Sequence, residues 1–523
     1  MKKFKKFAAV GCVLSLLLTA CGNEGKVSKS DFKFENYPIE TDEKLTYWCT
    51  INTAISSVVD NVGKTEFAKE LAKRTGVEIE YMHPAAGQAS TALSLMIASD
   101  QLPDMIETGW STYGGGPAKS IKEGIIYPLN DYLEHAPNLK KFLEENPEID
   151  KMVKTDDGTY YAFPFIREDK RLLISVGTLI RTDWLEELGL EEPKTIAEME
   201  TVLRAFKEKK SADAPLSFKS GDRSKFLGNF STSTSFYLED GKVVYGPLTE
   251  NYKYALETMK RWYDEGFFDP NFVSVDNAGL TANVLNGKTG ITVNTGGGGL
   301  GTWLDNMKGK DFDMSGIAYT KISDDKEVSY FSVDSNYPGY GSVAITTACK
   351  NPELAVRWLD YGFSEEGYIL NNFGTEGVSF EKKGDEYVYT DNIFNNPDGL
   401  TMSQAMAKYF RSSLSGPFVQ SKSYINQFYY RPQQQKALEA WLTNFDVANK
   451  NTIPNITKTE DEAKEFSSIM AEITKYESKM FTNFVNGTTS LDEYDKFIEE
   501  IKGLNIDRAI EIQEAALERY NNR

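Results

Sequence analysis

The chain is poor in the residues that most often carry out catalysis or bind transition metals. Its 523 residues include only two histidines, His83 and His135, and four cysteines. Neither histidine belongs to an H-E-x-x-H sequence or to another metal-ligand spacing, and the chain has no G-x-S-x-G sequence. A complete calcium-binding loop is also missing, since SDDKE at 323–327 is more simply a solvated turn. We therefore expect no catalytic residues, no metal and no cofactor.

Basic residues are also in the minority. The chain has 58 lysines and arginines against 77 aspartates and glutamates, and its formal net charge is −19. Loss of the four lysines in residues 1–20 would make that charge −23. Because nucleic acids are bound through a basic surface, this balance excludes DNA and RNA as expected partners.

Long apolar runs are absent apart from one near the N-terminus. Ala8–Ala20 is too short to span a bilayer comfortably, and the lysine-rich MKKFKKF before it is typical of a signal peptide. The run ends in LTAC, which resembles the bacterial lipoprotein cleavage box. That resemblance implies removal of residues 1–20 and acylation of Cys21, for example with palmitate, which would anchor the protein on the extracytoplasmic face of the cell membrane. Residues 21–43 are polar and are predicted to form a tether.

Few cysteines would remain after such processing. Cys12 would be removed with the signal peptide, and Cys49 and Cys349 would be left besides the acylated one. A disulfide between these two is possible outside the cell, but the sequence cannot show it. Two small buried thiols are the simpler interpretation.

Alternating strand-like and helix-like segments fill most of the chain. From residue 44 to residue 108 the order is strand, helix, strand, helix, strand, which predicts an α/β lobe with a largely parallel sheet. The chain is too long for one small core, so two lobes or more are expected. Further predicted strands lie in 172–181 and 341–349, and hairpin turns are predicted at Asp157-Gly158 and Asp240-Gly241. Further predicted helices follow Thr182 and Thr195, lie in 250–270, and extend from about 460 to 523 with breaks near 486–487 and 503.

Several segments, in order along nearly the whole chain, resemble one known family. They are LPDMIETGW, GIIYPLNDYL, LIRTDWLEELGLEEPKTIAEME, NYKYALETMKRWYDEGFFDPN, NGKTGI, GSVAITTACKNPELAVRWLDYGFSEEG and NNFGTEGVSF. With the cleavage box, they are similar to the family 1 extracellular solute-binding lipoproteins of ABC importers. Within that family they are most similar to the large branch common in Gram-positive bacteria, which is associated with oligosaccharides.

The resemblance implies a two-lobed periplasmic-binding-protein type II fold with a hinge and a ligand cleft between the lobes. By analogy, the first lobe comprises 44–165 and 316–346, and the second comprises 166–315 and 347–523. The expected partners are an oligosaccharide and the permease subunits of an ABC transporter, and we expect a monomer.

Sugars have flat C–H faces and hydroxyl-rich edges, so a carbohydrate cleft needs aromatic rings and polar side chains together. Loops that follow strands at the edge of a lobe are the places to look for them, although each such residue has packing in the core as its alternative. For Glu376 the resemblance also implies a turn near the cleft. The predicted ligand-binding residues are Trp48, Asn52, Trp110, Tyr113, Arg167, Trp303, Tyr337, Tyr340 and Glu376, whereas Trp184, Trp262, Trp358 and Trp441 have the helical spacing of core residues.

A glycine-rich segment, GITVNTGGGGLGTW at 290–303, contains the spacing G-x-G-x-x-G after a strand-like run. A dinucleotide-binding turn needs a helix that opens at the third glycine and an acidic residue at the end of the next strand. Here the segment after Gly301 is short and is interrupted by Gly309. We therefore interpret the glycines as a means of bringing backbone and Trp303 to the rim of a cleft.

Other classes of function stay open at this point. A solute-binding protein for a non-sugar ligand such as a peptide would share the fold, and a surface glycoside hydrolase or lyase is not excluded because carboxylates are plentiful. A purely structural surface protein is a further alternative. Stabilisation by an oligosaccharide without product formation would separate the first interpretation from all of these.

Overall fold

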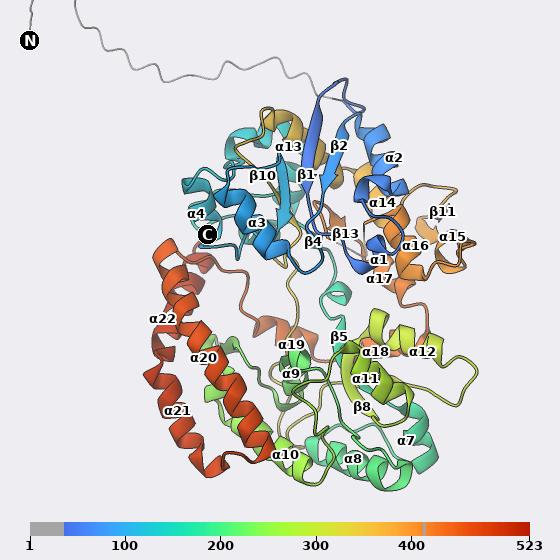
Figure 1. Ribbon diagram of the computed structural model, residues 1–523, viewed down its shortest axis with the longest axis vertical. Helices are drawn as coiled ribbons and strands as arrows, with labels where there is room; N and C mark the ends of the chain where they lie inside the picture. Colours follow the sequence, from blue (N-terminus) through green and yellow to red (C-terminus); the bar gives the residue numbers. More distant parts are fainter. Residues whose placement is uncertain (1–35, 412–414) are drawn as a thin grey trace, which may run out of the picture.

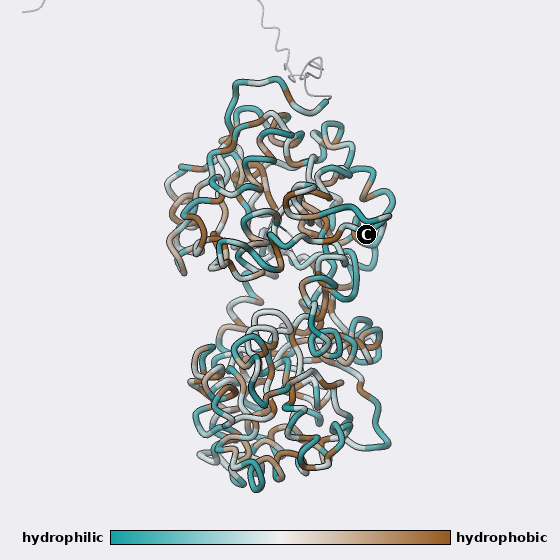
Figure 2. The backbone as a smooth tube through the Cα atoms, turned by 90° about the vertical axis from the view of Figure 1, so that its right-hand side faces the viewer, coloured by the Kyte–Doolittle hydropathy of each residue, from teal (hydrophilic) through white to brown (hydrophobic). Residues whose placement is uncertain are grey.

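The computed structural model describes residues 36–411 and 415–523. The described chain forms two lobes that are joined by a narrow waist (Figures 1 and 2). The predicted two-lobed organisation is thus confirmed. The predicted signal peptide, Cys21 and the tether up to residue 35 lie outside the described residues. Within the described residues, no helix has both the length and the apolar character that a membrane crossing requires.

The first lobe is built on a four-stranded sheet with the order β10-β3-β1-β2. The strands β1, β2 and β3 are mutually parallel, and β10 is antiparallel to β3, so the predicted largely parallel sheet is confirmed. The Thr65 hydroxyl accepts from the amide of Ala68 at the start of α2, and Gly76 ends that helix in the left-handed conformation. The elements are β1 (Lys44–Trp48), α1 (Thr53–Ser56), α2 (Glu66–Thr75), β2 (Glu78–Met82), α3 (Ala89–Ala98), β3 (Met105–Thr108), α4 (Gly116–Lys122), α5 (Pro137–Glu145), α6 (Pro147–Met152) and β10 (Ser342–Ile345).

The second lobe has a three-stranded antiparallel sheet in which β5 lies between β8 and β9. A capping box at Thr195 and Glu198 starts α8 at the predicted position. The helices α8 and α10 bury Phe206 and Trp262 in one large core with residues of β8. The elements are β5 (Val176–Ile180), α7 (Thr182–Leu188), α8 (Ile196–Lys210), α9 (Arg223–Leu227), the hairpin β6 (Phe236–Glu239) and β7 (Lys242–Tyr245), α10 (Glu250–Asp264), α11 (Asn277–Leu285), β8 (Ile291–Thr295), α12 (Thr302–Asn306) and β9 (Ser315–Gly316).

Segments downstream of β10 stay on the first lobe before the chain crosses again. The helix α13 contributes Leu354 and Trp358 to the core of the first lobe, and β13 pairs in parallel with β4 at the waist. The predicted division placed these residues in the second lobe and 316–346 in the first. We propose instead that the first lobe continues to about residue 428, and that the segment after β9 stays on the second lobe at least as far as Tyr330, which stacks on Tyr237 of β6. The elements concerned are β4 (Ile166–Arg167), α13 (Pro352–Asp360), α14 (Glu365–Phe373), β11 (Phe380–Lys383), β12 (Glu386–Tyr389), α15 (Asp391–Phe394), α16 (Met402–Tyr409), β13 (Val419–Gln420) and α17 (Lys422–Phe428), followed on the second lobe by α18 (Pro432–Leu442) and α19 (Phe445–Lys450).

Three helices at the end of the chain form an arm along one side of both lobes (Figure 1). The arm consists of α20 (Glu460–Asn486), α21 (Tyr494–Gly503) and α22 (Ile506–Asn521), with breaks where the sequence predicted them. It belongs to the second lobe by packing, because Phe484 and Ile501 are buried in the core that contains α8 and α10.

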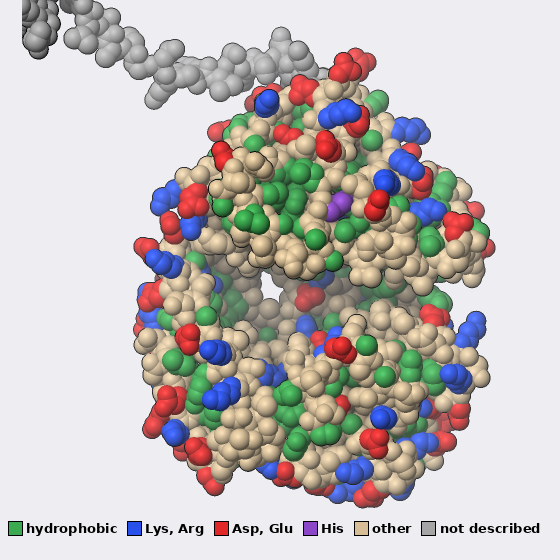
Figure 3. All heavy atoms as spheres, in the orientation of Figure 1, with side chains coloured by type: hydrophobic (Ala, Val, Ile, Leu, Met, Phe, Trp, Pro, Cys, Tyr) green, Lys and Arg blue, Asp and Glu red, His purple; other side chains and the backbone are tan. Residues whose placement is uncertain are grey.

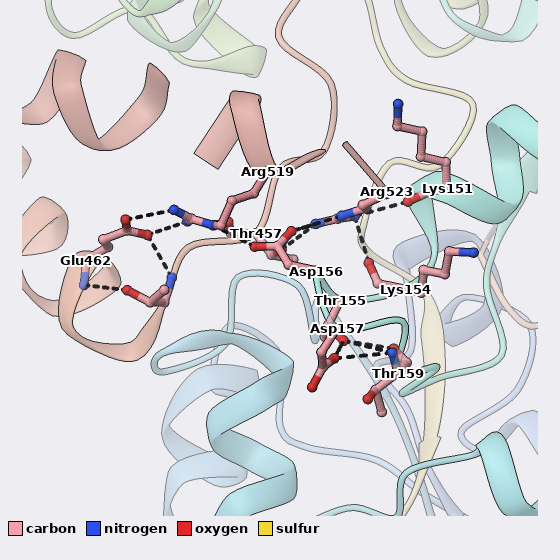
Figure 4. Close-up of polar contacts among 11 residues, drawn as sticks. Lys151, Lys154, Thr155, Asp156, Asp157, Thr159, Thr457, Glu462, Arg519 and Arg523 are labelled. Atoms are coloured by element: carbon pink, nitrogen blue, oxygen red, sulfur yellow. Dashed lines mark hydrogen bonds and ion pairs between the residues drawn. The ribbon is translucent and has the colours of Figure 1, made fainter. Parts of the chain in front are cut away.

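The far end of the arm is attached to the first lobe through Asp156 (Figure 4). Arg519 Nε donates to one carboxylate oxygen of Asp156 at 2.8 Å, and Arg523 donates to the other at 2.6 and 2.9 Å. Arg523 also donates to the carbonyl oxygens of Lys151 and Lys154, at 3.0 and 2.7 Å. Burial alone would raise the pKa of Asp156, but the hydrogen bonds from the two guanidinium groups hold that pKa below its usual value.

The two cysteines of the described residues are buried and unpaired. Cys49 follows β1, and its sulfur lies 3.8 Å from His83 Nδ1. Burial raises the pKa of the Cys349 thiol to about 12 and that of the Cys49 thiol even further. Both therefore stay in the protonated, unreactive form near neutral pH, as the simpler interpretation of the sequence predicted.

Candidate functional site

A cleft of about 500 Å³ lies at the waist between the two lobes. Figure 3 shows a hollow between the lobes in this region. Both lobes and the crossing segments supply its walls, so a molecule bound there would touch all of them. The residues that line this first compartment are Thr50, Asn52, Ile55, Glu107, Arg167, Leu172, Ser175, Thr295, Gly297, Gly298, Tyr340, Arg411, Ser415, Gln420, Tyr424, Ile425, Phe428 and Tyr429.

A second compartment of about 660 Å³ continues from the first along the first lobe. The two have Thr50, Glu107, Tyr340 and Ser415 in common, so they form one continuous cleft. The second compartment is lined mainly by the ends of β1 and β3, by α3 and by the loop before α4. Its residues are Trp48, Thr50, Ala89, Ser90, Leu93, Ser94, Glu107, Thr108, Gly109, Thr112, Tyr113, Gly114, Tyr340, Gly341 and Ser415.

A buried ion pair lies where the compartments meet. Arg411 Nη2 donates to Glu107 Oε2 at 2.8 Å, and the two side chains are only 9% and 7% exposed. Tyr47 donates to the same oxygen at 2.6 Å, and Ser415 donates to Oε1 at 2.7 Å. Burial alone would lower the pKa of Arg411, but the charge of Glu107 raises it. Arg411 is therefore held as a cation, and the hydrogen-bonding capacity of both side chains is largely used.

A second cation, Arg167, lies at the waist. Its Nη1 donates to Asp334 at 2.7 Å, its Nη2 donates to the hydroxyl of Tyr340, and its guanidinium carbon lies 5.7 Å from the centre of that ring. The backbone amide of Arg167 donates to Asn336, which belongs to the segment that returns from the second lobe. Since the side chain of Tyr340 stays 45% exposed, its ring is held in place and still offers a face to the cleft.

Aromatic rings at the C-terminal end of α17, those of Phe428 and Tyr429, pack against the glycine-rich segment of the second lobe. Residues Gly296–Gly301 form a π-helix that leads into α12. A side chain at Gly296 would place its first carbon 2.7 Å from the ring of Tyr429, and one at Gly297 would collide with Phe428. The glycines are therefore needed for the close approach of these rings, and the space beside Gly296 is not free for a phosphate group.

Comparison with known proteins agrees with this geometry. The family model described as bacterial extracellular solute-binding protein matches residues 57–369, which is more than half of the chain. The chain belongs to that family.

Two curated relatives of this solute-binding protein extend the comparison. FusA of Streptococcus pneumoniae, a fructooligosaccharide ABC transporter substrate-binding protein, is 27% identical over 535 residues, and the match covers 95% of this chain and 96% of FusA. YtcQ of Bacillus subtilis, a polygalacturonan/rhamnogalacturonan-binding protein, is 27% identical over 341 residues, with 62% and 66% covered.

Solved structures share the fold of this solute-binding protein. Alginate-binding protein AlgQ2 without calcium ion has a TM-score of 0.75 at 23% identity, with 92% of this chain and 100% of AlgQ2 covered. FusA in complex with kestose has a TM-score of 0.74 at 21% identity, with the same coverage. The predicted two-lobed type II fold is thereby confirmed. In the part of the chain that the structure describes, no cluster of three or more His, Cys, Asp or Glu side chains is arranged to hold a metal.

Five of the nine predicted ligand-binding residues line the cleft of this solute-binding protein. Arg167 and Asn52 line the first compartment, Trp48 and Tyr113 the second, and Tyr340 both. Asn52 also caps α1, because its side-chain oxygen accepts from the amide of Ile55. These residues follow strand ends or lie at a crossing between lobes, which is the reasoning that selected them.

The other four do not line the cleft in this conformation. Trp110 and Trp303 are buried, and their indole nitrogens donate to Ile106 and Thr281. Tyr337 is buried as well and shares a hydrogen bond of 2.9 Å with Tyr161. Glu376 is exposed in a turn after α14, outside both sets of lining residues. The rings of Trp110 and Trp303 pack beneath their loops, so the interpretation that they present a face to a ligand requires correction.

Sequence reasoning missed Glu107 and the whole contribution of the 411–429 segment. This segment reaches the cleft because β13 pairs with β4, a contact between residues far apart in the sequence. The aromatic sequence SYINQFYY at 423–430 is a signal that could have suggested it. Trp184, Trp262, Trp358 and Trp441, which were predicted to be core residues, are all buried.

Proposed function

We propose that this protein captures an oligosaccharide outside the cell and delivers it to the permease of an ABC importer. The observation that carries the proposal is the cleft between the lobes, in which exposed aromatic surface at Tyr340 adjoins hydroxyl, amide and guanidinium groups. Sugar rings bind to such a mixture through their C–H faces and hydroxyl edges. Membership of the solute-binding family and similarity to FusA support the same ligand class.

The proposed mechanism needs no chemical step. In the open form the two lobes sample closure, and a ligand that touches both lobes stabilises the closed form. Arg167 lies at the waist and contacts segments that cross between the lobes. A ligand bound to Arg167 could therefore change the relative stability of the open and closed forms. The closed protein then docks on the permease. We further propose that Cys21 carries the lipid anchor and that the protein acts as a monomer.

Ligand-dependent stabilisation tests this function. Purified protein, titrated with oligosaccharide panels, is expected to gain about 2.7 kcal/mol of unfolding free energy at a ligand concentration about one hundred times Kd. Chromatography of the same mixtures is expected to show no product. Glycan turnover would overturn the proposal in favour of a hydrolase or lyase, and stabilisation by peptides alone would favour a peptide-binding protein.

A pair of tyrosine variants locates the site. Tyr340→Ala is expected to weaken oligosaccharide binding about tenfold, because it removes a ring that lines both compartments. Tyr430→Ala is the matched control, since Tyr430 is 50% exposed and does not line either compartment. Equal affinity of the two variants would show that the ligand binds elsewhere.

A further inference from the structure

The second compartment differs in charge from the rest of the molecule. Its described lining contains hydroxyl groups, backbone and aromatic surface, but no lysine, arginine or histidine. Its one acidic residue is Glu107, whose carboxylate already accepts from Tyr47, Arg411 and Ser415. An anion in this compartment would lie near a buried carboxylate without a free cation to pair with it, which is unfavourable.

The helix that forms one wall of this compartment is free of charge throughout. Residues 84–99, which include α3, contain no charged side chain, although 26% of all residues are charged. Leu93 is buried under the helix, while Ser90 and Ser94 are exposed on the face that lines the compartment. Figure 3 shows hydrophobic side chains gathered on the first lobe in the area of α3.

Aromatic surface is present as well. Tyr113 supplies it, because its half-buried ring lines the compartment and packs edge-on against buried Trp110 with 5.8 Å between ring centres. Trp48 also lines the compartment but is only 4% exposed. Trp110 therefore acts on this site as a support for Tyr113. Rings beside hydroxyl groups, without charge, match the surface of an uncharged sugar better than that of a uronate.

We propose that the second compartment is a subsite for the further units of an uncharged oligosaccharide whose first units occupy the compartment at the waist. This inference rests on the proposed function and deepens it, since it names the ligand as a neutral chain long enough to fill both compartments. It also separates this protein from relatives whose names specify alginate or polygalacturonan as ligands.

Oligosaccharide series of increasing chain length, here called ladders, test the inference on the whole protein. Calorimetric titration uses neutral ladders (fructo-, malto-, cello-, xylo- and manno-oligosaccharides) and an oligogalacturonate ladder, each from about two to about seven units. We expect a neutral ladder to bind, with affinity about tenfold higher for long members than for the shortest binder. Preference for oligogalacturonate, or equal affinity for short and long chains, would overturn the inference. Failure of every glycan would instead refute the proposed function itself.

A matched pair of serine variants tests the subsite directly. Ser94→Trp fills the compartment and is expected to abolish the gain in affinity from chain length while leaving the shortest binder unaffected. Ser99→Trp makes the same change at the end of α3, at a residue outside the lining, and is expected to keep the gain. Thermal unfolding of both variants checks that they are folded. If Ser94→Trp keeps the full length dependence, the further units bind elsewhere and the inference is wrong.

Discussion

Two clusters of charged residues connect distant parts of this chain, and they differ in exposure and in what they join. The cleft cluster consists of Glu107, Arg411 and their hydroxyl partners, and it joins segments of the first lobe. The arm cluster consists of Asp156, Arg519, Arg523 and Glu462, and it joins the first lobe to helices that pack on the second. The side chains of Glu107 and Arg411 are under 10% exposed, whereas those of Asp156, Glu462 and Arg519 are 26%, 17% and 30% exposed. Arg523, at 2%, is the one buried member of the arm cluster, and it keeps the carbonyl oxygens of Lys151 and Lys154 as acceptors if Asp156 is removed.

The difference shows how burial decides the role of an ion pair. Breaking a buried pair leaves a charge that water cannot reach, so the cost falls on global stability. Breaking a partly exposed pair lets water replace much of what is lost. The arm cluster is therefore expected to matter less for folding and more for how freely the lobes move.

The largest effect is expected for Arg411→Ala. It leaves Glu107 buried and unpaired, so unfolding free energy should fall by about 3–5 kcal/mol, measured by urea denaturation. The double variant Glu107→Gln, Arg411→Met removes both charges and should be less destabilised than the single one. A single variant as stable as the double would contradict the contrast between the clusters.

A smaller effect is expected for Asp156→Ala. It removes the acceptor shared by Arg519 and Arg523, so unfolding free energy should fall by about 1–2 kcal/mol and amide hydrogen exchange in α22 should increase. Asp324→Ala, at an exposed aspartate of the second lobe, serves as the control. If amide hydrogen exchange in α22 is unchanged in Asp156→Ala, the arm stays attached to the first lobe without this contact.

The pH dependence of the same contact has a definite sign. Because the pKa of Asp156 is lowered in the folded protein, its stabilising contribution is present above the unfolded pKa, about 3.9, and is lost as pH falls through the lower folded value. The difference in melting temperature between the unmodified protein and Asp156→Asn should therefore be constant near neutral pH and shrink below about pH 4. A difference that grows on acidification would be inconsistent with this assignment.

The smallest effect is expected for Lys122→Ala. Lys122 donates to Glu460 at 2.9 Å and thereby also joins the first lobe to the arm, but both side chains are largely exposed. Urea denaturation should show no measurable change, and added salt should not alter that result. A clear loss of stability would show that an exposed ion pair can contribute as much as a buried one, against the contrast drawn between the two clusters.

Much of the fold could be predicted from the sequence, because local signals were strong. Thr195 starts a helix as predicted, and Asp240-Gly241 turns a hairpin. Of the candidate site, residues at strand ends or crossings such as Asn52 and Tyr340 were found. Trp110 and Trp303 were misjudged because sequence position gives the loop but not the side of the loop on which a ring packs. Arg411 and Phe428 were missed because only long-range pairing brings them to the cleft.

Attachment of the arm to the first lobe makes the cleft asymmetric along its length. The second compartment ends at the loop before α4, and α4 is the helix that meets the arm through Lys122 and Glu460. An oligosaccharide that fills both compartments would thus have one end near the arm and the other at the waist. The two ends of such a chain would therefore lie in unlike surroundings, one beside the arm and the other at the waist.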